Sequence, residues 1–243
     1  MRRSGLKVAV CGAAGKMGSE VVEFFQSSGD VVVTHGVEKE GHPSVGQRVH
    51  GVPVVEDLSR VVDLVDCLVD FTAPQFTTEL LKSATKAKKP LVIGTTNLRG
   101  DSLRAMKEST KDIPIVLYPN MAPGMNVLFK YIPDVAKSLG KGFDISIVET
   151  HHRTKRDTPS GTARKLAQAL KSEMGREPEM LSLRSGDIIG EHVVTFVGEG
   201  EMVRLTHLAY SRRAFASGAL LAVRFVVEAK PGLYSMFDVL GLR

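Results

Sequence analysis

The chain contains 243 residues, of which 43% are hydrophobic and 24% are charged, and its formal net charge is +5. This composition is typical of a globular chain with a substantial core and excludes a disordered one. No apolar stretch approaches the roughly 20 residues that a membrane helix needs, and the start does not resemble a signal peptide, so we expect a cytoplasmic protein with no membrane partner. Because basic residues are dispersed and tryptophan is absent, we expect small anionic ligands and no nucleic acid.

In the first half, short apolar runs alternate with helix-like segments. The predicted strands are residues 6–11, 31–37, 67–71, 91–94 and 115–117. Helices are predicted from about residue 16, over 75–86 and over 101–110. This alternation predicts βαβ units, and hence an α/β fold with a Rossmann-like parallel sheet and helices on both faces.

After Met125 the pattern changes. Apolar and polar residues alternate over 143–149, 192–197 and 201–207, a hairpin is predicted at 199–200, and one long helix is predicted over 160–174. This pattern predicts a second α+β domain with a mainly antiparallel sheet. Residues 214–228 and 233–240 are predicted to be helical. We therefore expect a dinucleotide-binding domain at 1–122 and 214–243, and a substrate-binding domain at 123–213.

A glycine-rich turn, GAAGKMG at residues 12–18, separates the first predicted strand from the first helix. Its GxxGxxG spacing differs from the usual GxGxxG, but Glu38 follows Gly18 by twenty positions, at the end of the second strand, where an acid binds ribose hydroxyls. The alternative is a tight turn with a surface glutamate. The Glu38 carboxylate repels the 2′-phosphate of NADPH, whereas the Lys39 ammonium can bind it. Lys39 can equally be a solvated surface charge. The pair therefore indicates that NADH, NADPH or both serve as the cofactor.

Polar turns follow two later strands, and ligands bind beyond the carboxyl ends of strands in an open parallel sheet. Simple loop capping is the alternative for these turns. The candidate cofactor-binding residues are Gly12, Ala13, Ala14, Gly15, Lys16, Met17, Glu38, Lys39, Gly94, Thr95, Thr96, Tyr118, Pro119, Asn120 and Met121.

The segment ETHHRTKRDTPSGTA, residues 149–163, carries the most chemistry. We expect Thr158 to cap a helix that begins at Pro159, so that the following amides form an anion socket, with Lys155 and one histidine supplying charge and a proton. A metal site is not expected, because no carboxylate or cysteine stands at ligand spacing. A basic surface loop is the alternative, and a nucleophilic serine lacks the GxSxG context.

The chain resembles the 4-hydroxy-tetrahydrodipicolinate reductase family, also called dihydrodipicolinate reductase, of the diaminopimelate route to lysine. The resemblance is carried in family order by VAVCGAAGKMG, VIGTT, ETHHRTKRDTPSGTA, RSGDIIGEH and SRRAFASGA, which span nearly the whole chain. It implies a homotetramer joined through the sheet of the second domain, and domain closure during the reaction. Arginine is frequent in the family at the position of Lys39, which leaves the NADH or NADPH preference open.

The resemblance also implies roles for single residues. His151 and Lys155 match the catalytic proton-carrying pair, and the substrate carboxylates are expected at His152, Ser160, Gly161 and Thr162. The implied reaction is hydride transfer to a cyclic imine dicarboxylate, with the ring nitrogen protonated by Lys155 or His151. Another nicotinamide-dependent dehydrogenase is the first rival, but neither Cys11 nor Cys67 is placed as a catalytic cysteine. A sensor of NAD(H) without catalysis is the second rival.

Overall fold

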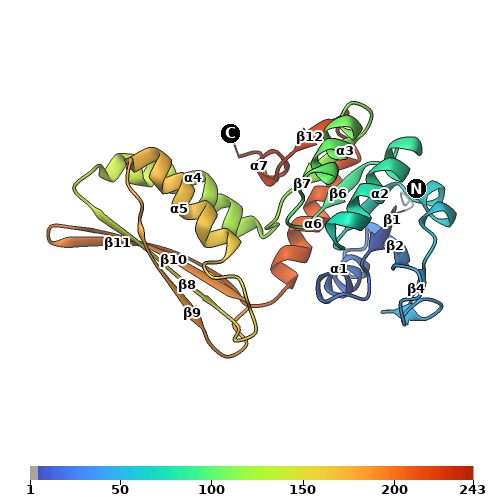
Figure 1. Cartoon of the computed structure of the whole chain (residues 1–243), viewed down its shortest axis with the longest axis horizontal. Coiled ribbons are helices and arrows are strands. Elements are labelled where there is room, and N and C mark those ends of the chain that lie inside the picture. The colour runs from blue at the N-terminus through green and yellow to red at the C-terminus, as the bar shows by residue number, and fades with distance from the viewer. Residues whose placement is uncertain (1–4, 243) are drawn as a thin grey trace. The chain divides into compact units, whose positions relative to one another are not determined.

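The computed structural model describes residues 5–242 and divides into two compact units (Figure 1). The first unit runs to Met121 and resumes at Phe215–Gly241, and the second is Ala122–Ala214. In the described part of the chain, no helix is both long and apolar enough to cross a membrane.

The first unit is built on an eight-stranded sheet with the order β12-β7-β6-β5-β1-β2-β4-β3. Its strands are β1 (Leu6–Cys11), β2 (Val31–Val37), β3 (Arg48–Val49), β4 (Val52–Val55), β5 (Cys67–Asp70), β6 (Leu91–Ile93), β7 (Pro114–Leu117) and β12 (Gly232–Tyr234). All neighbours are parallel except β3 and β4. The predicted parallel α/β sheet is thus confirmed.

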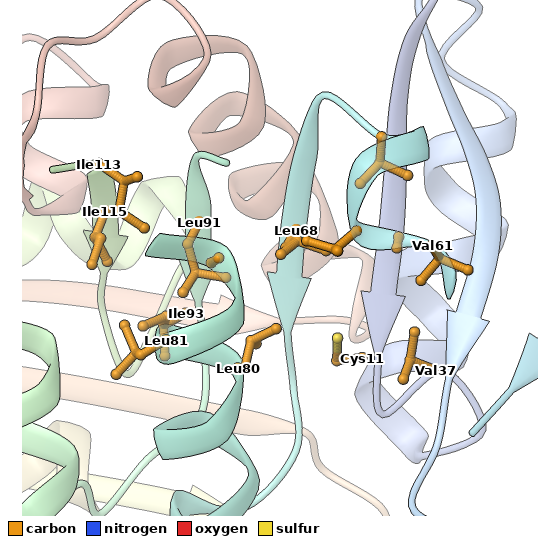
Figure 2. Close-up of a cluster of buried hydrophobic side chains, with 14 of the residues drawn as sticks. Cys11, Val37, Val61, Leu68, Leu80, Leu81, Leu91, Ile93, Ile113 and Ile115 are labelled. Carbon is orange, nitrogen blue, oxygen red and sulfur yellow. The ribbon is translucent and has the colours of Figure 1, made fainter. Parts of the chain in front are cut away.

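Helices pack against this sheet, and a continuous cluster of buried hydrophobic side chains lies between the helices and the strands. They are α1 (Lys16–Gln26), α2 (Pro74–Lys86), α3 (Asp101–Ser109), α6 (Arg213–Val226) and α7 (Met236–Val239), with short 3-10 turns at Leu58–Arg60 and Val62–Leu64. Figure 2 shows Leu80 and Leu81 of α2 facing side chains of β5 and β6, and all of them are fully buried. Burying each such side chain contributes about 1.5–3 kcal/mol.

The predicted helix at 233–240 is wrong in its first part. Leu233 and Tyr234 lie in β12, which pairs with β7. The helix α7 begins only at Met236, because Ser235 caps it in a reciprocal arrangement with Asp238.

The second unit contains a four-stranded sheet with the order β11-β10-β8-β9. Its strands are β8 (Asp144–His151), β9 (Glu179–Arg184), β10 (Gly190–Gly198) and β11 (Glu201–Ala209). Strand β10 is antiparallel to β8 and β11, whereas β9 runs parallel to β8. The mainly antiparallel sheet and its hairpin at 199–200 are as predicted.

Two helices, α4 (Pro123–Leu139) and α5 (Gly161–Met174), lie side by side along this sheet (Figure 1). The prediction of only one long helix is wrong, because α4 is the longer of the two. Pro133 inside α4 obscures its helical pattern in the sequence, yet Met125, Phe129 and Ile132 form a buried stripe. Tertiary packing of that stripe outweighs the hydrogen bond that proline removes.

Candidate active site

The glycine-rich turn is held tightly between strands of the first unit. Gly12 has φ +78°, and a Cβ there would lie 2.5 Å from the carbonyl oxygen of Phe71, so no other residue fits without a shift. The Gly12 amide donates to the carbonyl of Val37 at 2.8 Å. These contacts place the turn at the carboxyl ends of β1 and β2, where ligands bind in sheets of this kind.

Glu38 reaches this turn directly. It follows β2 and is half-buried, and its Oε1 accepts a hydrogen bond from the Ala14 amide at 2.8 Å. Gly15 is the N-cap of α1 and offers no side-chain cap, so a phosphate can take the place that a capping side chain would fill. Lys39 is exposed. An acid beside an uncapped glycine-rich helix start fits a nicotinamide dinucleotide.

The two later turns divide into buried and accessible residues. Thr95 is buried, and its hydroxyl accepts a hydrogen bond from the Thr72 amide at 3.0 Å. Tyr118 packs its ring against Phe237 with 5.8 Å between centroids, and Met121 is buried as well. The side chains of these candidates therefore point into the protein. Thr96, Pro119 and Lys16 are exposed. The half-buried candidates are Gly94, Asn120, Ala14 and Met17, and Ala13 is buried.

The two cysteines have no place in either candidate site. Cys11 and Cys67 are fully buried. Burial raises the pKa of both thiols, and the charges of Asp70 and Glu38 add to this effect at Cys11, whereas Asp66 does so at Cys67. Neither thiol is poised as a nucleophile.

In the second unit, Glu149 and His151 lie two residues apart on β8 and so face the same side of the sheet. Both are buried, and the Nδ1 atom of His151 contacts Oε2 of Glu149. The amide of Ser160 donates to the other carboxylate oxygen, Oε1, at 3.1 Å. A buried histidine is thereby joined to a buried acid.

Arg184 completes this cluster from the neighbouring strand. The parallel register of β8 and β9 sets Arg184 opposite His151. Its guanidinium contacts Glu149 with both terminal nitrogens, Nη2 to Oε1 at 2.8 Å and Nη1 to Oε2 at 3.1 Å. Such a bidentate pair is among the strongest charge-assisted hydrogen bonds in proteins.

The charges of the cluster follow from these contacts. Burial alone would raise the pKa of Glu149, but hydrogen bonds from Arg184, Ser182, His151 and Ser160 lower it to about 2. Burial lowers the pKa of His151, and the charges of Lys155 and Arg184 lower it further, against the opposing effect of Glu149. The ionised carboxylate can only accept, so the proton of a neutral His151 lies on Nδ1 and its Nε2 is the basic atom.

His192 of β10 lies behind His151. The two rings meet edge to face with 5.1 Å between centroids, and Nε2 of His192 is 3.2 Å from the Ser160 hydroxyl. Burial, and next the charge of His151, lower the pKa of His192 to about 3, so its ring is neutral at physiological pH. Among the described residues its Nδ1 has no hydrogen-bond partner.

The predicted helix cap is wrong in position. The cap is Ser160, whose hydroxyl accepts from the Ala163 amide at 3.1 Å, and α5 begins at Gly161 rather than at Pro159. The peptide between Thr158 and Pro159 is cis. The Ser160 amide already donates a hydrogen bond to Glu149, so it does not contribute to the predicted anion-binding site. Gly161 is exposed, and an added Cβ there would meet nothing nearer than 3.9 Å.

The cationic loop before α5 has one internal ion pair. The ammonium of Lys155 lies 2.7 Å from Asp157, and its side chain is 23% exposed. Partial burial would raise the pKa of Asp157, but the hydrogen bond and charge of Lys155 lower it overall. His152 is half-buried, and its Nδ1 is 2.8 Å from the Thr154 hydroxyl. Across the described residues, no three metal-binding side chains gather as a metal site would require.

Three residues of this cluster were missed as site residues by the sequence analysis: Glu149, Arg184 and His192. The spacing of two between Glu149 and His151 on a strand was an available signal for a shared face. For His192, the alternation of apolar and polar residues around it was a weaker signal. No local pattern links Arg184 to the histidine pair, because strand pairing alone brings them together.

Comparison with known proteins gives one consistent family. A family model described as dihydrodipicolinate reductase, N-terminus, matches residues 6–121, and the corresponding C-terminus model matches residues 124–240. The 4-hydroxy-tetrahydrodipicolinate reductases of Geotalea uraniireducens and Citrifermentans bemidjiense are 41% and 40% identical to this chain, over 98% of it and 100% of each relative.

Solved structures agree on the fold. Dipicolinate-bound dihydrodipicolinate reductase from Paenisporosarcina sp. TG-14 aligns with a TM-score of 0.82 at 24% identity, over 96% of this chain and 98% of that one. Aspartate semialdehyde dehydrogenase II from Vibrio cholerae aligns with a TM-score of 0.60 at 12% identity, over 92% and 99%.

Proposed function

This chain belongs to the dihydrodipicolinate reductase family, and we propose that its two parts share the work of that reaction. The chain is an oxidoreductase that reduces 4-hydroxy-tetrahydrodipicolinate with NAD(P)H in the diaminopimelate route to lysine. In this proposal residues 1–122 and 214–243 bind the dinucleotide, and residues 123–213 bind the dicarboxylate. The observation that carries the proposal is the Glu149–His151–Arg184 cluster, with Glu149 and His151 buried, together with Lys155 and the exposed start of α5.

The dinucleotide is assigned to the glycine-rich turn and Glu38. The start of α1 would hold the phosphates, and the Glu38 carboxylate would bind the adenosine ribose after exchanging its contact with the Ala14 amide. When bound, the reduced nicotinamide supplies the hydride. Lys39 is exposed beside Glu38, which supports acceptance of both NADH and NADPH.

The substrate carboxylates are assigned to the start of α5 and the cationic loop. Gly161 and Thr162 lie in the first turn of α5, where backbone amides favour an anion, and His152 and Lys155 stand on the loop before it. Lys155 would exchange Asp157 for a substrate carboxylate. The dipicolinate named in the Paenisporosarcina structure is a ligand of this same chemical class.

Protonation is assigned to His151 and Lys155. Loss of the 4-hydroxyl as water, on the enzyme or before binding, leaves a C=N bond conjugated with a C=C bond. Hydride addition to this conjugated imine moves an electron pair onto nitrogen, which must then receive a proton. Lys155 is a cation that can donate one, and the basic Nε2 of His151 can receive a proton and pass it on while Glu149 stabilises the imidazolium. A dehydrogenase with a catalytic cysteine is disfavoured because both thiols are buried.

We also propose a homotetramer joined through the open face of the second sheet. The register sets Leu181 and Leu183 of β9, Val197 of β10, and Met202 and Leu208 of β11 on one face, and all five side chains are exposed. An exposed apolar face of this kind is typical of an interface. Light scattering should give four copies, and the double variant Leu181→Glu/Met202→Glu should give smaller species. A wild-type monomer would overturn this assignment.

The reductase assay follows reduced-nicotinamide absorbance with freshly prepared synthase product, testing NADH and NADPH separately. We expect oxidation that depends on the dicarboxylate. The variant Lys155→Met should lose activity, and its matched control Lys171→Met, which removes an exposed lysine of α5, should keep it. If NADH binds but neither cofactor is oxidised, the reductase function fails and a sensor of NAD(H) becomes the better explanation.

A further inference from the structure

We propose that Glu149 and Arg184 are positioning residues that orient His151 and the Lys155 loop as one unit. The inference rests on the reductase function proposed above and adds two residues that do not themselves meet the substrate. Both lie in the second unit: Glu149 contacts the His151 ring, and Arg184 contacts Glu149 and the backbone carbonyl of Lys155.

The Glu149 carboxylate has all of its acceptor positions in use. Oε1 receives the Ser160 amide and Nη2 of Arg184, and Oε2 receives Nη1 of Arg184 and Nδ1 of His151. The side chain is 1% exposed, so water does not compete for these positions. A carboxylate saturated in this way cannot rotate without losing several bonds, and it therefore holds the proton of neutral His151 on Nδ1.

The ring of His151 is confined on its other sides as well. A Cβ on Gly190 would lie 3.0 Å from Nε2 of His151, so a larger residue at this position would crowd the ring. His192 packs edge to face against the same ring. With Glu149 on Nδ1, the ring has one orientation, and its reactive nitrogen is Nε2.

Arg184 extends this arrangement to the loop of Lys155. Its Nε donates to the Lys155 carbonyl at 3.3 Å, and its Nη2 donates to the Asp157 carbonyl at 2.6 Å and to the Thr158 hydroxyl at 3.2 Å. This loop contains no helix or strand, so the guanidinium supplies tertiary contacts that set its path. One planar side chain thus ties the backbone of Lys155 to the acid that holds His151.

The first test is Glu149→Gln. A glutamine amide can donate to Nδ1 of His151 and so favour the tautomer with the proton on Nε2, which removes the basic atom from the site. We expect kcat to fall by about 100-fold or more, with the KM for NADH unchanged and the pH dependence of kcat altered. Glu149→Asp keeps the carboxylate and should restore part of the activity.

A readout independent of turnover accompanies this variant. Imidazole ¹⁵N spectra report which ring nitrogen of His151 carries the proton, with His151→Asn used for assignment. The wild type should be protonated on Nδ1 and Glu149→Gln on Nε2. A folded Glu149→Gln protein with unchanged tautomer and kcat within about twofold of the wild type overturns the proposal.

The second test is Arg184→Lys, which keeps the charge but loses the planar fork. Its control is Arg176→Lys, which changes an exposed arginine of the same unit that pairs with Asp144. We expect Arg184→Lys to lower kcat by roughly 10- to 100-fold and to raise the KM for the dicarboxylate, and Arg176→Lys to change neither.

If circular dichroism shows that Glu149→Gln does not fold, the kinetics of Arg184→Lys test the positioning role instead. Unchanged kinetics in Arg184→Lys would overturn the proposal. The results distinguish the two proposals. An inactive wild type refutes the reductase function, whereas an active wild type whose Glu149 and Arg184 variants keep its kinetics refutes only the positioning role.

Discussion

The buried carboxylate of Glu149 should make folding of the second unit sensitive to acid. Burial alone would raise its pKa, but the hydrogen bonds from Arg184, Ser182, His151 and Ser160 together lower it from the ordinary 4.5 to about 2. A pKa lowered on folding stabilises the native state above the unfolded-state pKa, and this stability is lost as the pH falls through the folded-state value. The relevant window therefore runs from about pH 4.5 down to about pH 2.

The size of the effect follows from the same values. Each pH unit of difference is worth about 1.4 kcal/mol, so the lowering from 4.5 to about 2 corresponds to about 3 kcal/mol at neutral pH. Roughly 2 kcal/mol of this should be lost by pH 3. The Glu149→Gln variant has no ionisable group at this position and should lose none of it.

Urea unfolding followed by circular dichroism between pH 6 and pH 3 measures this difference. We expect the free energy of unfolding of the wild type to fall by about 2 kcal/mol more than that of Glu149→Gln over this range. Glu177→Gln, which removes an exposed carboxylate paired with Lys171, is the control and should follow the wild type closely. Parallel curves for the wild type and Glu149→Gln would refute the assignment of a strongly stabilised carboxylate.

Three further predictions concern the two candidate sites. His151→Ala and Lys155→Ala should each lower turnover strongly while leaving NADH affinity, measured by calorimetry, nearly unchanged; a parallel loss of affinity would count against their catalytic roles. Lys39→Glu should raise the KM for NADPH more than that for NADH, and equal changes would show that Lys39 does not meet the 2′-phosphate. Gly12→Ala should lower the free energy of unfolding by about 1–3 kcal/mol in urea, because its Cβ would meet the Phe71 carbonyl; an unchanged value would contradict this.

Local pattern was sufficient for much of the first unit. Buried parallel strands such as β1 and β5 appear as continuous apolar runs, and the glycine-rich turn follows from residues adjacent in the chain. The same reasoning overlooked α4, where Pro133 interrupts the helical pattern, and β9, whose mostly exposed side chains give no alternation of buried and exposed residues. It also placed the cap of α5 two residues early, because the contact of the Ser160 amide with Glu149 is not a local one.

The sequence by itself determined the α/β class, the position of the glycine-rich turn and the family, since these depend on short-range spacing and on motifs such as that of residues 149–163. Only the tertiary structure decided which groups surround His151. Arg184 is 35 residues from Glu149 in sequence, and His192 is 32 residues from Ser160. The register of β8 and β9 brings the first pair together, whereas the second joins strand β10 to the cap of α5. Both depend on how the elements pack rather than on any one segment.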